Sequence, residues 1–296
     1  MGKKLFYYIT LMRPANIVTA ITDIIAGAAI GGALFAGSTH AENLGFLIFS
    51  TIGLYGGGIV FNDIFDLEID RKERPERILP SGKLSLTAAY VFGIALLLMG
   101  IIAAFIVSPT SGSIAIGIAL FALSYDRFTK HIQWLGPLNM GMCRAGNLLL
   151  GVSIIPGMVG QYWWLGIVPI LFISAVTLTS QKEAVGENKR SIALALGLDG
   201  IILIILLLLR TYTGFNLTIA AAFILIWFSM NALAKYSAIR NNTPDKIKRA
   251  VKMGVLSLIP LDAAFAAGFS GILWLGLIVL LLFPLSIALA KRFAVT

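Results

Sequence analysis

One acidic segment of the chain, NDIFDLEID, has the composition of a metal-binding site. It places three aspartates, an asparagine and a glutamate directly after a run of apolar residues. If the segment is helical, a step of about 100° per residue turns Glu68 away from the other acidic side chains. Clustered carboxylates repel one another unless cations neutralise them, and oxygen ligands suit Mg²⁺, which often links carboxylates to a substrate phosphate. The ligands that share one face are Asn62, Asp63, Asp66 and Asp70.

Basic residues follow this segment in the stretch RKERPERILPSGKL. Pro75, Pro80 and Gly82 favour a loop there, and the loop could hold a polyanion against the metal. The cations in question are Arg71, Lys72, Arg74 and Arg77. Taken alone, they are equally well explained by the retention of basic residues on the cytoplasmic side of a membrane. For an arbitrary acidic run a solvated helix end is the simpler interpretation, but the one-sided spacing argues against it.

A second acidic segment occurs in TLTSQKEAVGENKRS. Glu183 and Glu187 are four residues apart, so they lie about 40° from each other on a helix. Between the two acidic segments, SYDRFTK adds Tyr125, Asp126, Arg127 and Lys130. Two acidic helix ends that face each other, with cations between them, predict a diphosphate site.

The composition identifies the elements that must position these residues as membrane helices. Of 296 residues, 58% are hydrophobic and 12% are charged, and the mean hydropathy is +0.91. These values predict an all-α, polytopic membrane bundle, because each apolar block is about 20 residues long and can cross the hydrocarbon layer as a helix. Nine helices remain an alternative to ten, since the fourth block is short and several blocks contain proline. The blocks cover 15–36, 43–66, 84–107, 112–128, 135–156, 161–183, 190–211, 215–237, 247–269 and 272–291.

Basic residues gather on alternate connections between these blocks, which predicts that both chain ends lie in the cytoplasm. The net charge of +9 is then explained by topology and contact with anionic headgroups, and no nucleic-acid partner is expected. A single cysteine, Cys143, excludes an internal disulfide, and two histidines provide no Cys/His metal site. The N-terminal segment has no signal-peptide cleavage pattern, so we expect the first helix to be retained.

The acidic and basic motifs together resemble the UbiA superfamily of intramembrane prenyltransferases. The family motif Asn-Asp-x-x-Asp-x-x-x-Asp is matched at every fixed position of 62–70, and RPERILPSGKLS is similar to the loop that follows it. Tyr125 to Lys130 resembles a Tyr-x-x-x-x-Lys element, and Arg13-Pro14 followed by Asn16 also fits. The resemblance covers about residues 10–270. It implies one membrane domain over 1–296, with an extra C-terminal helix at 272–291.

The second acidic segment departs from the family pattern. Family members usually have aspartates where this chain has Ser180, Glu183 and Glu187, whereas Gly186 is kept. Glutamate preserves the charge, but Ser180 removes one carboxylate. We expect metal binding to be retained, with a different metal number or substrate. This departure and the tenth helix are similar to a UbiA-like branch called EboC.

The resemblance implies Mg²⁺-dependent transfer of a prenyl group from an isoprenoid diphosphate to a lipophilic acceptor in the bilayer, in the cell inner (plasma) membrane. It implies catalytic roles for Asp63, Asp66 and Lys130. The metal ligands would be the four side chains of the first motif with Glu183 and Glu187. The diphosphate would be held by Arg71, Lys72, Arg74, Arg77, Lys130, Tyr125 and Asn16.

Four charged residues lie near the middles of expected helices: Asp23, Arg144, Asp199 and Asp262. Such groups usually face a cavity or each other. Arg144 could contact an acceptor carboxylate or phosphate, and an internal pair with Asp23 or Asp199 is the alternative. Two other functions remain open. A terpene cyclase or diphosphate lyase would quench the cation without an acceptor, and a lipid transporter or binding scaffold would not catalyse a reaction.

Overall fold

The computed structural model describes residues 2–34, 40–130, 132, 135–181 and 186–293, and most of these residues are helical. Each of the ten expected apolar blocks is helical over most of its described length, which confirms the all-α class. Polar residues and prolines fix several starts. The Ser85 and Ser108 side chains accept hydrogen bonds from the first turns of α5 and α6, and Pro109 and Pro244 occupy first helical positions.

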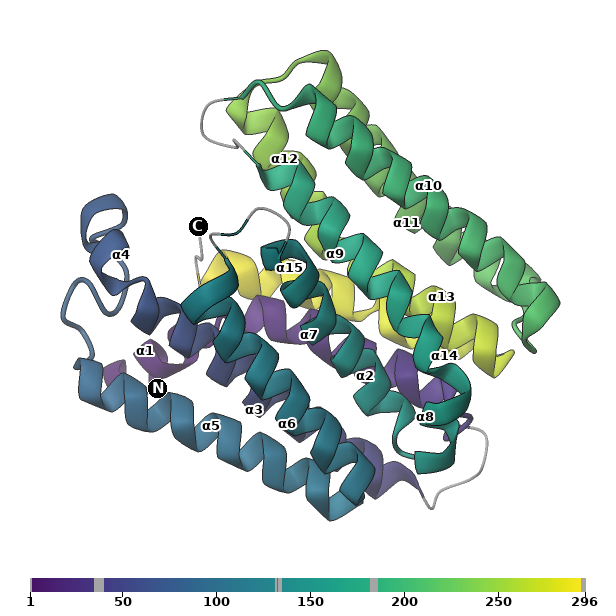
Figure 1. Cartoon of the computed structure of the whole chain (residues 1–296), viewed down its shortest axis with the longest axis horizontal. Helices are drawn as coiled ribbons and strands as arrows, with labels where there is room; N and C mark the ends of the chain where they lie inside the picture. Colours follow the sequence, from purple (N-terminus) through teal and green to yellow (C-terminus); the bar gives the residue numbers. More distant parts are fainter. Residues whose placement is uncertain (1, 35–39, 131, 133–134, 182–185, 294–296) are drawn as a thin grey trace.

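The helices follow one another along the chain with short connections (Figure 1). Some are broken spans: α8 and α9 are joined by a 3₁₀ turn at Trp163–Gly166, and a π-helical turn at Tyr125–Thr129 follows α6. Their bounds are α1 Lys3–Leu11, α2 Pro14–Ile30, α3 Ala41–Phe65, α4 Leu67–Glu73, α5 Leu86–Val107, α6 Pro109–Ser124, α7 Leu135–Val152, α8 Pro156–Tyr162, α9 Ile167–Ser180, α10 Lys189–Tyr212, α11 Leu217–Arg240, α12 Pro244–Leu256, α13 Leu258–Ser270, α14 Leu273–Leu280 and α15 Leu282–Arg292.

The chain is an integral membrane protein. Among the described residues, seven helices are long and apolar enough to cross a bilayer, and α1 with α2, bent by 53°, can supply an eighth span. The expected count of nine or ten is therefore not confirmed. The difference arises at 109–124 and 135–152, which are helical. The first is only 16 residues long, and the second carries polar residues that lower its hydropathy.

Two large hydrophobic clusters form most of the core, and α2 and α7 contribute to both, while a third, small cluster joins α10, α11 and α12. One cluster joins α2 and α7 to α9, α10, α11 and α13, and the other joins them to α3, α5 and α6. Figure 1 shows α2 and α7 in the middle of the molecule, with α10 and α11 along one edge and α5 along another. Small residues allow close packing: a Cβ at Gly27 in α2 would lie 2.1 Å from the Leu148 carbonyl of α7.

The N-terminal and C-terminal helices meet. The Phe6 and Phe293 rings stack with centroids 5.4 Å apart, and the Ser286 hydroxyl of α15 donates to the Ala15 carbonyl, 3.0 Å away. Both ends therefore lie on the same side of the bundle, the side that also carries α4 (Figure 1). This placement agrees with an even number of crossings. A tight turn precedes the last span, where Gly271 adopts a left-handed φ of 67° between α13 and α14.

Candidate active site

The first acidic motif lies where α3 passes into α4. The expected single helix is interrupted, because Asp66 adopts φ −88° and ψ 1° between the two helices. The hydrogen bonds from Asp66 N to the Asn62 carbonyl and from Asp70 N to the Asp66 carbonyl persist, at 2.9 and 2.8 Å. Asn62, Asp66 and Asp70 therefore keep their helical i, i+4 spacing across the bend. Asp63 and Asp70 are buried, whereas the Glu68 side chain is 78% exposed and pairs with Arg71, as its position on the helix predicts.

Each of the three aspartates is paired with a basic side chain from another part of the chain. Asp63 pairs with Arg13, Asp66 with Lys130 and Asp70 with Arg77, whose guanidinium lies 2.7 Å from the carboxylate. Arg77 also lies 3.7 Å from Asp63. We call these six residues the mouth cluster. Its carboxylates come from one short segment, and its cations come from three connections that the sequence separates widely.

Arg13 reaches Asp63 because the chain bends sharply at the start of α2. Arg13 caps α2 with φ 50° and ψ 68°, a left-handed conformation that is uncommon for a residue with a side chain, and Pro14 occupies the first helical position. The bend between α1 and α2 is 53°. Arg13 belongs to an element that resembles one of the family, but its pairing with Asp63 was not predicted. The Arg-Pro pair was the available signal.

Arg77 is positioned by the loop after α4. Leu79 and Leu84 are buried in the core and anchor the loop, and Gly82 adopts φ 71°, which glycine tolerates best. The Arg77 side chain is 17% exposed. The three other expected diphosphate-binding cations, Arg71, Lys72 and Arg74, are exposed. Of the four predicted cations in this loop region, the structure thus brings Arg77 to the carboxylates.

Lys130 is positioned by the π-helical turn that follows α6. Its backbone N donates to the Tyr125 carbonyl, 3.1 Å away, five residues earlier. Such turns often occur at functional sites because they shift the side chains that follow. Asp126 in this turn accepts from the Asn62 amide at 2.9 Å.

An apolar cavity of about 310 Å³ adjoins the mouth cluster, and Arg13 of the cluster lines it. Its polar end is formed by Arg13, Asn16, Asn62, Tyr125 and Asp126, so two further predicted residues, Asn16 and Tyr125, belong to the same cavity. Gly58 lines the cavity as well. Aliphatic side chains from five helices form its walls, namely Leu54, Ile59, Ile118, Ile173, Val176, Val255 and Leu258.

The inner end of the cavity is polar and contains Arg144. The Arg144 guanidinium donates to Asp23 at 2.7 Å and to the Thr19 hydroxyl at 2.5 Å, and it lies 5.3 Å from the centre of the Tyr55 ring. Asn147 donates to the same Asp23 carboxylate at 2.9 Å. The internal pair with Asp23 is confirmed, and Arg144 nevertheless lines the cavity. Cys143 also lines it and is not fully buried.

Lys235 is a basic residue that lies inside the bundle and not on a connection between spans. It is 1% exposed and lies within α11, where its ammonium contacts Asp199 of α10 at 2.5 Å. The sequence suggested Arg144 as one partner for Asp199, and that pairing is wrong. Asp262 accepts from the Thr22 hydroxyl at 2.5 Å beside the Arg144 network. All four intramembrane charged residues therefore have polar partners.

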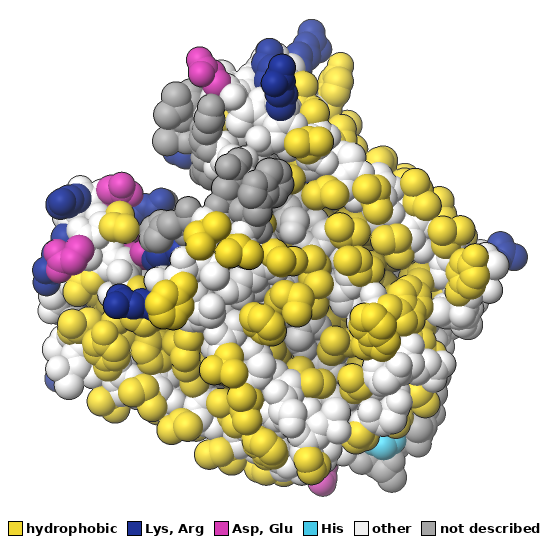
Figure 2. Space-filling view, viewed as in Figure 1, with side chains coloured by type: hydrophobic (Ala, Val, Ile, Leu, Met, Phe, Trp, Pro, Cys, Tyr) yellow, Lys and Arg dark blue, Asp and Glu magenta, His cyan; other side chains and the backbone are white. Residues whose placement is uncertain are grey.

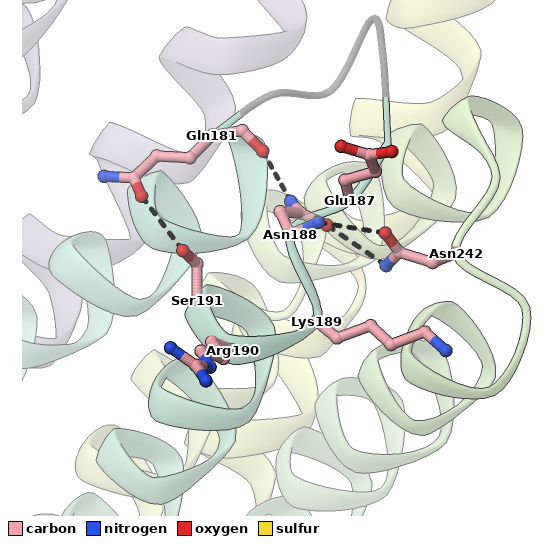
Figure 3. A pocket seen from close by; sticks show the side chains of 7 residues that line it. All are labelled: Gln181, Glu187, Asn188, Lys189, Arg190, Ser191 and Asn242. Carbon is pink, nitrogen blue, oxygen red and sulfur yellow. Dashed lines mark hydrogen bonds between the residues drawn. The ribbon is translucent and has the colours of Figure 1, made fainter.

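The second acidic segment is described only in part, since 182–185, including Glu183, lie outside the described residues. Glu187 is exposed and has a left-handed φ of 61°. Asn188 is buried and holds the segment in place: its side chain donates to the Thr179 carbonyl at 3.0 Å, and it exchanges hydrogen bonds with Asn242 at 3.0 and 3.1 Å. Figure 3 shows Glu187 beside this amide pair. Ser180 donates to the Thr177 carbonyl within α9.

The donor chemistry of the first motif fits Mg²⁺, because all four predicted ligands carry side-chain oxygen. In the described part of the chain, no three His, Cys, Asp or Glu side chains converge as a metal-binding group. Arg13, Arg77 and Lys130 instead balance the carboxylates. The motif therefore has the right ligands for Mg²⁺, and three basic side chains now supply the positive charge that a metal would bring.

Residues 24–256 match the model of the UbiA prenyltransferase family. A digeranylgeranylglyceryl phosphate synthase of Methanococcoides burtonii is 32% identical over 52% of this chain and 56% of its own length. One from Saccharolobus solfataricus is 28% identical over 88% of this chain and 96% of its own length. The chain spans about half the length of the first of these curated relatives.

Solved structures show the same fold. A digeranylgeranylglyceryl phosphate synthase structure superposes with a TM-score of 0.70 at 24% identity, covering 91% of this chain and all of that one. A UbiA homologue from Archaeoglobus fulgidus, bound to GPP and Mg²⁺, superposes with a TM-score of 0.64 at 15% identity, covering 90% of this chain and 99% of that one. The similarity to the EboC branch stays a prediction.

Proposed function

The chain belongs to the UbiA prenyltransferase family, and on that premise we propose that it transfers a prenyl group from an isoprenoid diphosphate to an acceptor held in the bilayer. Family membership assigns it to the prenyltransferases as an enzyme class. The observation that carries the proposal is that the mouth cluster adjoins the polar end of an apolar cavity, which Arg13 and Asn62 line. A charged diphosphate needs a polar, charged environment such as the mouth cluster, and a prenyl chain needs an apolar one such as the cavity.

In the proposed reaction, the allylic C–O bond of the substrate breaks and the diphosphate leaves with the bonding electrons. An acceptor oxygen or carbon then bonds to the allylic carbon and loses its proton to the departing diphosphate or to water at the mouth. We propose Arg77 and Lys130 as donors to the phosphate oxygens, with Tyr125 and Asn16 on the cavity side. Arg71, Lys72 and Arg74 remain predicted contacts for the outer phosphate.

We propose that Asn62, Asp63, Asp66 and Asp70 hold Mg²⁺ together with Glu183 and Glu187. When bound, Mg²⁺ neutralises charge on the leaving diphosphate. The A. fulgidus homologue binds GPP and Mg²⁺ together, which supports this part of the proposal. Asp63 is 8% exposed and Asp70 is 5% exposed, so water competes poorly with a metal for their oxygens.

The apolar walls favour a prenyl chain and exclude water from the carbocation. The Tyr55 ring faces Arg144 at the inner end and can shelter positive charge. We propose that Arg144 contacts a polar group of the acceptor there. Since several relatives are named digeranylgeranylglyceryl phosphate synthases, the first product to seek is a prenylated glyceryl phosphate. We further propose the cell inner membrane as the location, with both chain ends in the cytoplasm.

The test uses the full chain in detergent or vesicles with labelled prenyl diphosphates, a glyceryl phosphate lipid and Mg²⁺. We expect a prenylated lipid and stoichiometric diphosphate. Asp63→Asn, Asp66→Asn and Asp70→Asn should each reduce the rate by about a hundredfold or more, because each removes charge from the metal and diphosphate site. Glu68→Gln, on the same segment but pointing away, is the matched control. Wild-type turnover in any of the three Asp variants would count against the assignment.

Product analysis separates this reaction from the alternatives that the sequence left open. A hydrocarbon or alcohol product formed at the same rate without acceptor would indicate a cyclase or lyase. A transporter or binding scaffold would retain the labelled diphosphate and release none. Treatment with a chelator should stop turnover, and added Mg²⁺ should restore it.

A further inference from the structure

A groove between α11 and α12 lies outside the proposed active site. It has a volume of about 590 Å³ and is lined on the α11 side by residues from Leu225 to Ser237. These residues recur every three or four positions along the outer face of α11. Trp227, Asn231 and Lys235, on the opposite face of the helix, are buried. The groove therefore faces away from the bundle.

The groove has an apolar length and a basic end. Leu225 and Leu233 are 66% and 71% exposed. At 1.5 Å per residue, the twelve steps from Leu225 to Ser237 span about 18 Å, close to the depth of one bilayer leaflet. Because α11 and α12 run antiparallel from a turn at 241–243, Lys246 and Arg249 of α12 lie beside the Ser237 end.

The spacing of Lys246 and Arg249 along α12 places both residues on the side of the helix that faces the groove. Lys246, Arg249 and Met253 fall within about 60° on α12 and all line the groove. Lys248 and Lys252 lie on another face, about 200° and 240° around the helix from Lys246, and Asp245 is on their side. No acidic residue is among the described residues that line the groove. Figure 2 shows Lys and Arg side chains at this end of the molecule, above a hydrophobic flank.

We propose that this groove binds one anionic phospholipid. Its phosphate would pair with Lys246 and Arg249, and one acyl chain would lie along α11 toward Leu225. A basic group at the end of an apolar groove between membrane helices is complementary to a lipid with a charged headgroup. A soluble anion would satisfy the two cations but leave the apolar length in contact with other lipid. This site is independent of the proposed prenyl transfer.

The test compares two double variants that lose the same charge from the same helix. Purified protein in detergent is given equal amounts of phosphatidylglycerol and phosphatidylcholine, and the retained lipid is measured by native mass spectrometry. The wild type should retain one phosphatidylglycerol in preference. Lys246→Gln with Arg249→Gln should reduce that preference about tenfold or more, since each cation near the surface contributes roughly fivefold. Lys248→Gln with Lys252→Gln should retain it.

Two results with these double variants would overturn the proposal. One is an unchanged preference in the Lys246 and Arg249 variant. The other is an equal loss in the Lys248 and Lys252 variant, which would indicate diffuse attraction to the whole basic helix. Glycerol phosphate at millimolar concentration should not displace the lipid, and displacement would identify a soluble-anion site instead. The charge-preserving variant Lys246→Arg with Arg249→Lys should keep the preference, and the melting temperatures of all variants report whether they fold.

Discussion

At the scale of single residues, cations that look alike in the sequence differ in their burial and in their contacts with the mouth cluster. Arg77 is largely buried and contacts two aspartates, whereas Lys83, in the same loop, is exposed and donates to the Glu76 carbonyl. A preorganised cation in a partly buried site contributes far more than a solvated one. Arg77 and Lys83 therefore allow a matched comparison, in which one positive charge is removed from the same loop in each variant.

We expect Arg77→Gln to reduce diphosphate release about a hundredfold and Lys83→Gln to change it by less than about threefold. Steady-state rates at saturating Mg²⁺ measure both. Equal losses in the two variants would mean that the loop acts through its net charge and not through the position of Arg77.

The Asp199–Lys235 pair makes a second prediction at this scale. Both side chains are buried, at 0% and 1% exposure, so removal of one partner leaves a charge without compensation. Lys235→Met should cost about 3 kcal/mol or more of stability. Asp199→Leu combined with Lys235→Met should recover much of that loss, because an apolar pair needs no compensation. Thermal unfolding in detergent measures this double-mutant cycle, and additive losses would show that the two residues are not coupled.

The sequence was most informative where chemistry depends on local spacing. The face shared by Asp63, Asp66 and Asp70 follows from helical periodicity, and so does the exposure of Glu68. It was least informative for pairs formed between distant helices. The Asp199–Lys235 pair was not predicted, because nothing near Lys235 in sequence indicates Asp199, which lies 36 residues earlier. Arg13 was missed as a partner of Asp63 for the same reason.

At the scale of helices, glycines fix how closely α3 approaches α5, and α3 carries the acidic motif. A Cβ at Gly53 would lie 2.5 Å from the Leu96 carbonyl and 3.0 Å from the Gly100 Cα. Gly45, eight residues earlier in the same helix, has no such neighbour within 4 Å. A substitution at Gly53 therefore affects both helix packing and helix propensity, whereas a substitution at Gly45 affects helix propensity alone.

Gly53→Val should therefore destabilise the protein by about 2 kcal/mol or more, because the backbone of one helix must move away from the other. Gly45→Ala should be neutral or slightly stabilising through helix propensity. Melting temperatures in the same detergent measure both effects. A neutral Gly53→Val variant would contradict the close approach of the two helices.

Three local departures from ideal helices position the site, and none was predicted from apolar periodicity. They are the left-handed Arg13, the bend at Asp66 and the π-helical turn at Tyr125–Thr129. Periodicity reports which face of a helix is apolar. It does not report a break of one residue whose conformation is set by tertiary contacts.

At the scale of the whole molecule, membrane orientation is the next property to test. In a Cys143→Ala background, a cysteine at Gly157, before the main part of the α8–α9 span, should react with an impermeant maleimide on intact cells. A cysteine at Ser81, in the loop that carries Arg77, should react only after the membrane is opened. Both positions are exposed. The reverse labelling pattern would contradict the cytoplasmic placement of the site.

The division of the chain into a core at about 10–270 and an added helix at 272–291 stays a prediction. The family match at 24–256 falls within the expected core. The α14 and α15 helices form one candidate span beyond it, and α15 packs beside α2. The contact of α15 with α2 connects this last span to the helix that follows Arg13.

The pairing within the mouth cluster has a consequence for the order in which ligands bind. Three carboxylates and three basic side chains make the cluster electrically neutral. Mg²⁺ alone or a diphosphate alone would add unbalanced charge to a partly buried site, whereas the two together largely cancel. We therefore expect positive thermodynamic coupling, in which each ligand tightens the binding of the other by the same factor. Mg²⁺ titrations with and without a non-cleavable prenyl diphosphate, followed by tryptophan fluorescence, measure that factor, and a factor of one would mean that the cluster admits its ligands independently.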